Sequence, residues 1–390
     1  MKFLHTSDWH IGRQFHNVSL LDDQAIVLDR IIAQLNEHDV DALVIAGDLY
    51  DRSVPPASAV ALLDKVFHTI SVEMNIPILL IPGNHDSAER LRFAARQLRT
   101  AGIYIFGDLQ DATNPVILKG KSGTEVAFFG LPYNDPEQVR LMFNATDIKT
   151  HNDAHTFMVD RIRTSPAFKE KPLGNTVLIS HCFVDGASAC ESERPLAIGG
   201  AERVDYQCME NFGYVALGHL HSPQYKGAEH IRYSGSPMKY SFSEVSQKKG
   251  TTLVTFDNNG LEEHKHLPLT ADRDMRIIDG EIQTIIDAAA DDSATDDYLL
   301  VRLQDKHAIL DAMGKLRQVY PNILALEKTA LMQTLAPAQL HREQLKRSEA
   351  SMFADFFGQT TGHDLSDSQT EALENLINQL HTGTDNGDKP

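Results

Sequence analysis

Five short polar clusters, each directly after a short apolar run, constrain this chain more than any other feature. They are Asp8-Trp9-His10, Gly47-Asp48-Leu49-Tyr50-Asp51, Gly83-Asn84-His85-Asp86, Ser180-His181 and Gly218-His219-Leu220-His221. The apolar runs before them have the length of buried strands and are too short for long helices. Ligands collect beyond the carboxyl ends of strands in open α/β sheets, so five strands that end in this way can converge on one small volume. The pattern predicts an α/β fold with one polar site.

The residue types in these clusters suit divalent metal ions. Carboxylates, imidazoles and one amide, without thiolates, favour Mn²⁺, with Mg²⁺, Fe²⁺ and Zn²⁺ as alternatives. Two ions roughly 3.5 to 4 Å apart need a shared ligand, and a carboxylate has two oxygens to share, so Asp48 is the candidate bridge. Asp8 and His10 are two residues apart and project to the same side of an extended chain, and His219 and His221 repeat that spacing.

No single cluster carries this interpretation. An Asp-x-His is usually a turn, and a lone histidine in an apolar run is usually a core residue. Five clusters in one chain, each after an apolar run, indicate a two-metal phosphoesterase site. Cys182 beside His181 suggests a nucleophile, but neighbouring residues on a strand face opposite sides, so we expect Cys182 to point into the core.

The series DWH, GDLYD, GNHD, SH and GHLH resembles the calcineurin-like metallophosphoesterase superfamily. Within it, the chain is similar to the SbcD-type nuclease subunits of bacteria. That similarity rests on the opening MKFLHTSDWHIG, on AGDLYD before Pro55-Pro56, on GNHDS, and on Tyr233-Ser234-Gly235-Ser236-Pro237 with Ser241-Phe242-Ser243-Glu244. It is strong over residues 1–250 and continues to the C-terminus by layout. It implies an α/β four-layer sandwich, with two central mixed β-sheets flanked by helices, followed by a small α/β capping domain and C-terminal helices.

The resemblance also implies roles for single residues. One ion would be held by Asp8, His10, Asp48 and His221, and the other by Asp48, Asn84, His181 and His219. His85 would face the scissile phosphate and stabilise the transition state or protonate the leaving oxygen, which suits an imidazole that titrates near neutral pH. Asp51 stands where archaeal and eukaryotic relatives carry a histidine, and it is a candidate to orient His85. Arg52 is either a phosphate contact or a solvated side chain.

The charge of the chain argues against strong DNA binding by the chain alone. The formal net charge is −18, whereas binding to a phosphate backbone depends on Lys and Arg. One stretch is an exception: Ser87 to Thr100 is predicted to be helical, with Arg92, Arg96 and Arg99 on one face. A DNA contact and a solvated surface helix explain this stripe about equally well.

Other features set the compartment. The three cysteines have neither disulfide nor metal-site spacing, and the N-terminus enters a strand without the features of a signal peptide. No apolar run approaches the length that spans a bilayer. We expect a cytoplasmic protein without membrane contact.

The sequence divides into four predicted segments: a nuclease domain at 1–270, a capping domain at 271–334, a helical partner-binding segment at 335–381 and a disordered tail at 382–390. In the capping domain we expect strands at Met275–Ile278 and Tyr298–Leu303, and helices at Ile282–Ala290 and Ala308–Tyr320. By resemblance this domain helps to select and hold DNA, and simple structural support is the alternative.

The C-terminal helices carry two apolar stripes. Their residues are Met352, Phe353, Phe356 and Phe357, and then Leu373, Leu376, Ile377 and Leu380. Ser366 and Gln369 have the spacing of a capping box at the start of the last helix. Such helices either pack on their own protein or enter a partner's groove. The resemblance favours the second: they would grip the coiled coil of an SbcC-like ATPase, with a homodimer of this chain inside a heterotetramer.

The predicted function is a metal-dependent DNA nuclease subunit of a repair and recombination complex. Its activities would be those of a double-strand exonuclease and a single-strand or hairpin endonuclease. A stand-alone metallophosphatase or nucleotide phosphodiesterase is the alternative, favoured by the acidic charge and by the Asp51-Arg52 pair. A binding subunit with a decayed site is a third possibility, against which the full ligand set argues.

Overall fold

The computed structural model describes residues 1–171, 173–193, 202–305, 307, 309–328, 353–354, 357 and 363–383. The chain divides into two compact units, Met1–Lys328 and Thr329–Pro390. Among the described residues, no helix has both the length and the apolar character that a membrane span requires.

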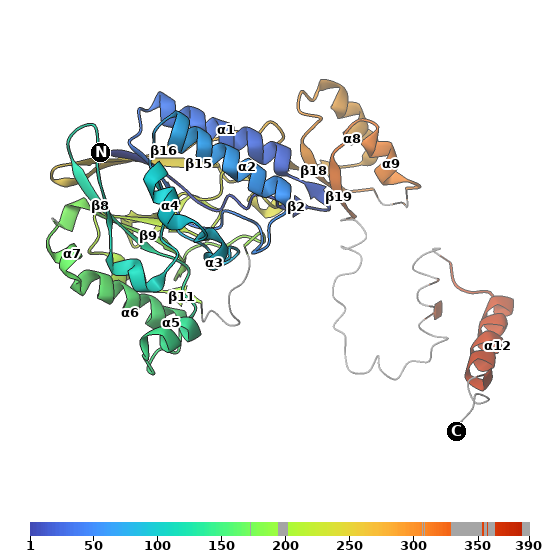
Figure 1. Ribbon diagram of the computed structural model, residues 1–390. Coiled ribbons are helices and arrows are strands. Elements are labelled where there is room, and N and C mark those ends of the chain that lie inside the picture. The colour runs from blue at the N-terminus through green and yellow to red at the C-terminus, as the bar shows by residue number, and fades with distance from the viewer. Residues whose placement is uncertain are drawn as a thin grey trace. The chain divides into compact units, whose positions relative to one another are not determined.

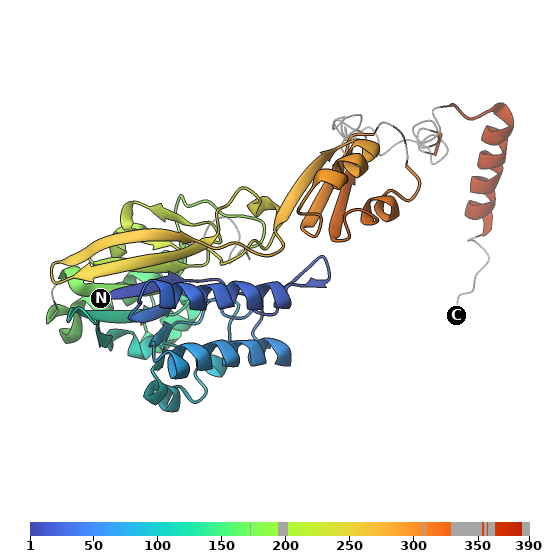
Figure 2. The ribbon, with the colours of Figure 1, turned by 90° about the horizontal axis from the view of Figure 1, so that it is seen from above.

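The first sheet of the larger unit has six strands, in the order β16-β15-β1-β4-β5-β6. Four of them are parallel: β1 (Lys2–Thr6), β4 (Ala42–Ile45), β5 (Ile78–Leu80) and β6 (Ile103–Ile105). An antiparallel hairpin of β15 (Gly250–Asp257) and β16 (Gly260–Pro268) extends the sheet beside β1. Figure 2 shows this hairpin next to α1 (Leu21–Glu37), whose Gln34 side chain donates to the Pro268 carbonyl at 3.1 Å.

The second sheet also has six strands, in the order β13-β14-β12-β9-β8-β7. Its four inner strands are parallel: β14 (Ala228–Tyr233), β12 (Tyr214–Gly218), β9 (Thr176–His181) and β8 (Glu125–Leu131). Two edge strands are antiparallel to their neighbours: β13 (Gln224–Lys226) and β7 (Val116–Lys119). All five apolar runs that precede the polar clusters are therefore strands, as the sequence predicts.

The two sheets lie face to face between two layers of helices (Figure 1). On the outer face of the first sheet lie α1 and α2 (Ala57–His68), which share a core with β1, β4 and β5. Helices α5 (Pro136–Phe143), α6 (His151–Thr164) and α7 (Pro166–Lys169) cover the second sheet. A third apolar cluster, which includes Phe3 and Val177, fills the space between the sheets. This arrangement confirms the predicted four-layer sandwich with two mixed sheets. Cys182 belongs to the core of the second sheet, as expected.

A small α/β module follows the β15–β16 hairpin along the chain. It has a parallel sheet of β17 (Met275–Gly280), β18 (Tyr298–Leu303) and β19 (Ile323–Lys328), with helices α8 (Ile282–Ala288) and α9 (Ala312–Arg317). The two predicted strands are present, and both helices are shorter than predicted. The third strand was not predicted, although its first four residues form an apolar run, Ile323 to Leu326. The domain boundaries at 270 and 334 stay predictions.

The predicted single helix over Ser87 to Thr100 is wrong. The segment folds as α3 (Ala88–Leu91), α4 (Ala95–Leu98) and a 3₁₀ turn (Arg99–Ala101). Ala94 separates α3 from α4 with a left-handed backbone, at φ 58°. The Ala and Arg residues here favour helix, so local propensity gave no sign of the break.

The smaller unit contains α12 (Asp367–Gly383), which includes the first two residues of the predicted tail. At its start, the Gln369 side chain accepts a hydrogen bond from the Ser366 backbone N–H at 2.9 Å, as in the predicted capping box. The side chains of Phe353 and Leu376 are 45% and 56% exposed. Met352, Phe356, the Leu380 side chain and residues 384–390 lie outside the described part of the chain.

Candidate metal centre

Loops from both sheets meet at the carboxyl ends of their strands. The backbone N–H of Asp8, after β1, donates to the Gly47 carbonyl, after β4, at 3.0 Å. The backbone N–H of His219, after β12 of the second sheet, donates to both carboxylate oxygens of Asp8 at 3.0 and 3.1 Å. Asp8 therefore joins the two sheets at the site.

The loop backbone is unusual at these positions. Asp8, His10, Asp48 and His219 all have positive φ, at 55°, 44°, 51° and 106°. Residues other than glycine adopt this conformation at a cost, of order 1–3 kcal/mol each, and such strain clusters at functional sites. The surrounding fold holds the four side chains in place against that cost.

The glycines that begin three of the clusters allow the loops to approach closely. A Cβ on Gly218 would lie 1.9 Å from the Ala46 carbonyl oxygen, and one on Gly83 would lie 2.1 Å from the Asp48 Oδ1. Neither contact is sterically possible. The small residue is needed at these positions because two loops from different strands occupy the same space.

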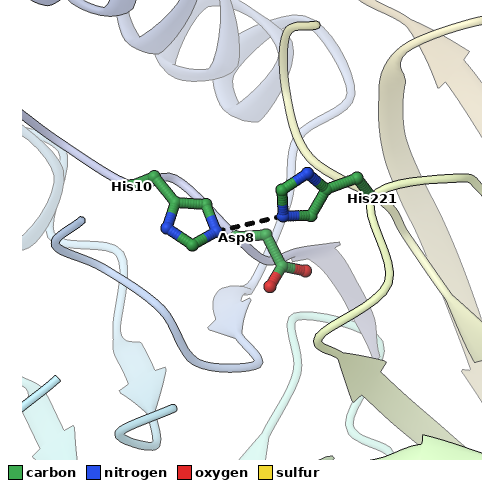
Figure 3. Close-up of side chains that lie close together, drawn as sticks. All are labelled: Asp8, His10 and His221. Carbon is green, nitrogen blue, oxygen red and sulfur yellow. Dashed lines mark hydrogen bonds between the residues drawn. The ribbon is translucent and has the colours of Figure 1, made fainter. Parts of the chain in front are cut away.

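The first half of the site contains Asp8, His10 and His221, whose potential ligand atoms all lie within 4.8 Å of one another (Figure 3). The Nε2 atoms of His10 and His221 are 3.0 Å apart. His10 is 1% exposed, and its Nδ1 has no hydrogen-bond partner among the described residues. Two imidazole nitrogens that face each other beside a buried carboxylate fit a shared divalent cation.

Asp48 lies between the two halves. Its Oδ2 is 3.7 Å from the His10 Nε2 and 3.4 Å from the His181 Nε2. Burial alone would favour the neutral acid, but the neighbouring His181 and His10 hold the pKa of Asp48 well below its usual range. The side chain is therefore an ionised carboxylate directed toward both halves.

The second half contains Asn84, His181 and His219. The Asn84 Oδ1 lies 2.9 Å from the His181 Nε2 and 3.2 Å from the His219 Nδ1. The Ala46 carbonyl accepts from the His181 Nδ1 at 2.8 Å, which leaves Nε2 for a ligand. Burial lowers the pKa of His219 to about 3, so its ring is neutral, the form that binds metal.

The Asp48 carboxylate also favours positive charge at His181. Burial opposes its protonation, yet Asp48 raises the pKa of His181 to about 9. A proton on His181 thus balances the buried carboxylate, which is the role that a cation would take. Asn84, His181 and His219 therefore fit a divalent ion, whose positive charge would take the place of that proton.

His85 lies beside the Asp48 carboxylate and contacts it through its backbone, not through its ring. Its backbone N–H donates to the Asp48 Oδ1 at 2.9 Å, and its ring Nδ1 lies 2.8 Å from the backbone oxygen of Asp51. A carbonyl only accepts, so Nδ1 carries the proton and Nε2 is available for another partner. The Asp51 carboxylate instead accepts from Arg13 at 3.2 Å, so Asp51 contacts His85 through its main chain.

Two groups of residues that hold the site loops in place were not predicted from the sequence. The Asp86 carboxylate accepts backbone N–H groups from Leu49, Tyr50 and Gly83 at 3.0 to 3.1 Å, which ties two of the loops together. Its position inside the GNHD cluster was the available signal.

The other group lies behind His221. Ser192 Oγ is 2.8 Å from the His221 Nδ1, and the Lys249 Nζ donates to the His221 carbonyl at 2.7 Å. Lys249 also pairs with buried Glu244, and this ion pair outweighs burial to hold the pKa of Glu244 well below its usual range. Glu244 lies in the SFSE segment, whereas Ser192 and Lys249 had no sequence signal.

The three arginines of the predicted stripe line one cavity of about 400 Å³, although they do not share a helix. The Arg92 Nη2 pairs with Asp108 at 2.7 Å, and the Arg99 guanidinium lies 5.3 Å from the centre of the Tyr104 ring. The other end of this cavity is formed by β6, β7 and the segment between them.

Residues 1–223 match the model of the calcineurin-like phosphoesterase family, and residues 272–361 match that of the type 5 capsule protein repressor C-terminal domain. The SbcD subunit of the SbcCD nuclease from Staphylococcus epidermidis is 34% identical over 377 residues, which cover 97% of this chain and 98% of that protein.

Two solved structures also align over most of their length. A hypothetical protein from Thermus thermophilus aligns with a TM-score of 0.39 and 11% identity over 70% of this chain and 99% of its own. A dimetal phosphatase from Danio rerio aligns with a TM-score of 0.37 and 11% identity over 69% of this chain and 99% of its own.

Proposed function

The chain belongs to the calcineurin-like phosphoesterase family and, within it, to the SbcD-type nuclease subunits, and we propose that it cleaves DNA as a double-strand exonuclease and a single-strand or hairpin endonuclease. The family makes it a metal-dependent phosphodiesterase of the nuclease class. The observation that carries the proposal is the 34% identity to a nuclease subunit over 97% of the chain.

Two divalent ions would be held by the seven residues of the centre. Asp8, His10 and His221 would bind one ion, Asn84, His181 and His219 the other, and Asp48 both. The Asp48 Oδ2, within 3.7 Å of one histidine from each half, supports the shared role. Oxygen and nitrogen donors without thiolate favour Mn²⁺. When bound, such ions neutralise charge on the phosphoryl oxygens and activate water.

The protein supplies a proton-transfer group beside these ligands. His85 would protonate the leaving oxygen or stabilise charge on it through Nε2. Its Nδ1 contact with the Asp51 carbonyl, at 2.8 Å, supports this role because it fixes the ring and its tautomer. The Asp51 carboxylate would act more indirectly, through Arg13 and at 3.7 Å from the His10 Nδ1.

An SbcC-like ATPase is the proposed partner of the C-terminal segment. The relative from Staphylococcus epidermidis is by its name one subunit of SbcCD. Exposed Phe353 and Leu376 supply apolar surface for a groove, and the net charge of −18 makes an assisting subunit useful for DNA binding. A homodimer of this chain within a heterotetramer belongs to the same proposal.

DNA contacts are proposed at two places. Arg92, Arg96 and Arg99 would contact backbone phosphates, which their common cavity supports because its three arginines outnumber its two carboxylates, Asp108 and Asp111. The module built on β17, β18 and β19 would hold DNA beside the centre. Residues 272–361 match a separate C-terminal domain family, which supports a role for this region distinct from catalysis.

One assay tests the proposed function. Labelled linear duplex DNA and a chromogenic phosphate ester are incubated in parallel with the Mn-loaded chain, with and without the ATPase and ATP. We expect Mn-dependent cleavage of the duplex that the ATPase and ATP stimulate. Hydrolysis of the ester without any cleavage of DNA, even with the partner present, would instead identify a stand-alone phosphatase.

A further inference from the structure

A second polar cavity, of about 480 Å³, is lined by residues of both sheets, among them Arg232 of β14 and Thr252 of β15. Ser222, Arg232, Lys248 and His266 are among the residues that line it. We propose that this cavity is a binding site for a phosphate group, separate from the metal centre.

The strand register explains why polar side chains line this cavity beside the apolar cluster between the sheets. Val254 and Phe256 of β15 belong to the apolar cluster between the sheets, and Thr252 faces the same side because it lies two residues before Val254. Thr252 pairs directly with His266 of β16. Arg232 adds a charged side chain to the cavity lining from β14 of the facing sheet.

The lining carries positive charge without a carboxylate. Its nine residues include Arg232, Lys248 and His266 but neither Asp nor Glu. Among the described residues, neither Arg232 nor Lys248 forms an ion pair. The Arg232 guanidinium lies 2.6 and 2.9 Å from the ring nitrogens of His264, and Glu229 lies 4.0 Å beyond that ring. Arg232 also donates to the Glu229 carbonyl at 3.3 Å and lies 5.7 Å from the centre of the Tyr225 ring. In a chain of net charge −18, two cations without a carboxylate partner at one cavity indicate an anionic ligand.

The electrostatics of His266 agree with this interpretation. Burial, then Arg232 and Lys248, lower the pKa of His266. The same positive potential that disfavours a charged His266 favours a bound anion.

The neutral donors of the cavity match a tetrahedral anion. Ser222 and Ser246 add two hydroxyls to the guanidinium and the ammonium group, whereas the Gln247 amide already bonds Cys190 and Lys249. Arginine forms paired hydrogen bonds with phosphate, and charge-assisted bonds of this kind are about twice as strong as neutral ones. The volume exceeds that of a phosphate ion, so a nucleotide or a backbone segment also fits.

Residues of the cavity are adjacent in the sequence to residues of the candidate metal centre and its supports. Ser222 follows His221 directly, and Lys249, next to Lys248, donates to the His221 carbonyl and to Gln247 Oε1, both at 2.7 Å. A phosphate in the cavity would therefore contact the two segments that support His221. Whether its source is DNA or a free nucleotide rests on the proposed function, whereas phosphate binding itself does not.

Chemical labelling of Lys248 tests the site in the full-length, Mn-loaded chain. The rate of modification by an amine-reactive reagent is measured by mass spectrometry in inorganic phosphate and in chloride of equal ionic strength. We expect phosphate to slow labelling of Lys248 with a saturable dose dependence. Exposed Lys265, which lies between His264 and His266 on β16 and so points to the opposite face, is the internal control and should not change.

Variants at Arg232 exclude an indirect effect from phosphate at the metal centre. Arg232→Gln should weaken the protection of Lys248 by about tenfold or more, the loss of a charge-assisted hydrogen bond. Arg232→Lys should retain part of the protection, and unchanged ester hydrolysis shows that each variant is folded. Equal labelling in phosphate and chloride, or protection that survives Arg232→Gln unchanged, would overturn the proposal.

A duplex with nuclease-resistant phosphorothioate links identifies the source of the phosphate. Protection of Lys248 by this duplex, lost in Arg232→Gln, assigns the site to the DNA backbone. Protection by phosphate but not by the duplex assigns it to a free phosphate or nucleotide. Because the phosphate arm needs no DNA cleavage, failure of the proposed nuclease function and failure of this site give different results.

Discussion

At the residue scale, the Asp48 carboxylate joins the two halves of the centre. One of its oxygens lies 3.4 Å from the His181 Nε2, and the other accepts the His85 backbone N–H at 2.9 Å. The same carboxylate thus positions the candidate proton donor and the candidate ligands. Its removal should therefore affect metal binding and catalysis together.

Asp48→Asn should lower metal occupancy at both positions and abolish hydrolysis, because the amide lacks the charge that a bridge needs. Metal content is measured by mass spectrometry of the purified protein, beside Asp64→Asn on the exposed side of α2 as control. Two tightly bound Mn ions and a near-normal rate in Asp48→Asn would show that Asp48 is not the bridge.

His85→Ala should retain both ions but lower the cleavage rate by about 10²- to 10⁴-fold, the usual contribution of a positioned acid or base. Rates and metal content are compared with His68→Ala, which removes a histidine that is 59% exposed on α2. Loss of metal in His85→Ala, instead of loss of rate, would make His85 a ligand.

At the scale of elements, the strands and the convergence of the polar clusters were predictable for the same reason. Buried strands of parallel sheets leave short apolar runs in the sequence, and functional residues follow their carboxyl ends. The broken helix at Ala94 and the Lys249 contact with His221 were not predictable. The first depends on one left-handed residue, and the second joins residues 28 positions apart that share no local pattern.

Gly218→Ala tests the convergence of the strands. The added methyl would overlap the Ala46 carbonyl oxygen, so β4 and β12 must separate, which should cost about 1–3 kcal/mol of stability and lower metal occupancy. Denaturant unfolding is compared with Gly280→Ala, where the nearest atom would lie 3.4 Å away. Equal stability and metal content of the two variants would contradict the close approach.

Replacing Arg92, Arg96 and Arg99 by Ala should weaken DNA binding and reduce its salt dependence, while ester hydrolysis stays unchanged. Log affinity falls as log salt concentration rises, and each lost phosphate contact makes this slope shallower by about 1. The control replaces Lys149, Arg163 and Lys169, which removes the same charge near α6 and α7. An unchanged salt slope would return the arginines to the solvated-surface interpretation.

At the scale of the whole molecule, catalysis and partner binding are assigned to different units. The candidate centre lies entirely within Met1–Lys328, and both predicted apolar stripes lie within Thr329–Pro390. The larger unit has its own cores between and outside the two sheets. Loss of the C-terminal helices should therefore leave the centre intact.

Deletion of Met352 to Pro390 should give a folded, Mn-binding enzyme that hydrolyses a small phosphodiester but no longer co-purifies with an SbcC-like ATPase. ATP-stimulated DNA degradation should be lost with it, because the apolar helix faces that would enter the partner's groove are absent. Unchanged affinity for the ATPase would contradict this assignment. Unfolding of the truncated chain would show that these helices complete the core of the larger unit.

The most direct test of the two-metal site is an anomalous-diffraction experiment on crystals of the Mn-loaded protein. We expect two Mn peaks roughly 3.5 to 4 Å apart. One should contact Asp8, His10 and His221, the other Asn84, His181 and His219, with Asp48 in contact with both. A single peak at full occupancy, or an Asp48 carboxylate that contacts only one ion, would contradict a two-metal site bridged by Asp48.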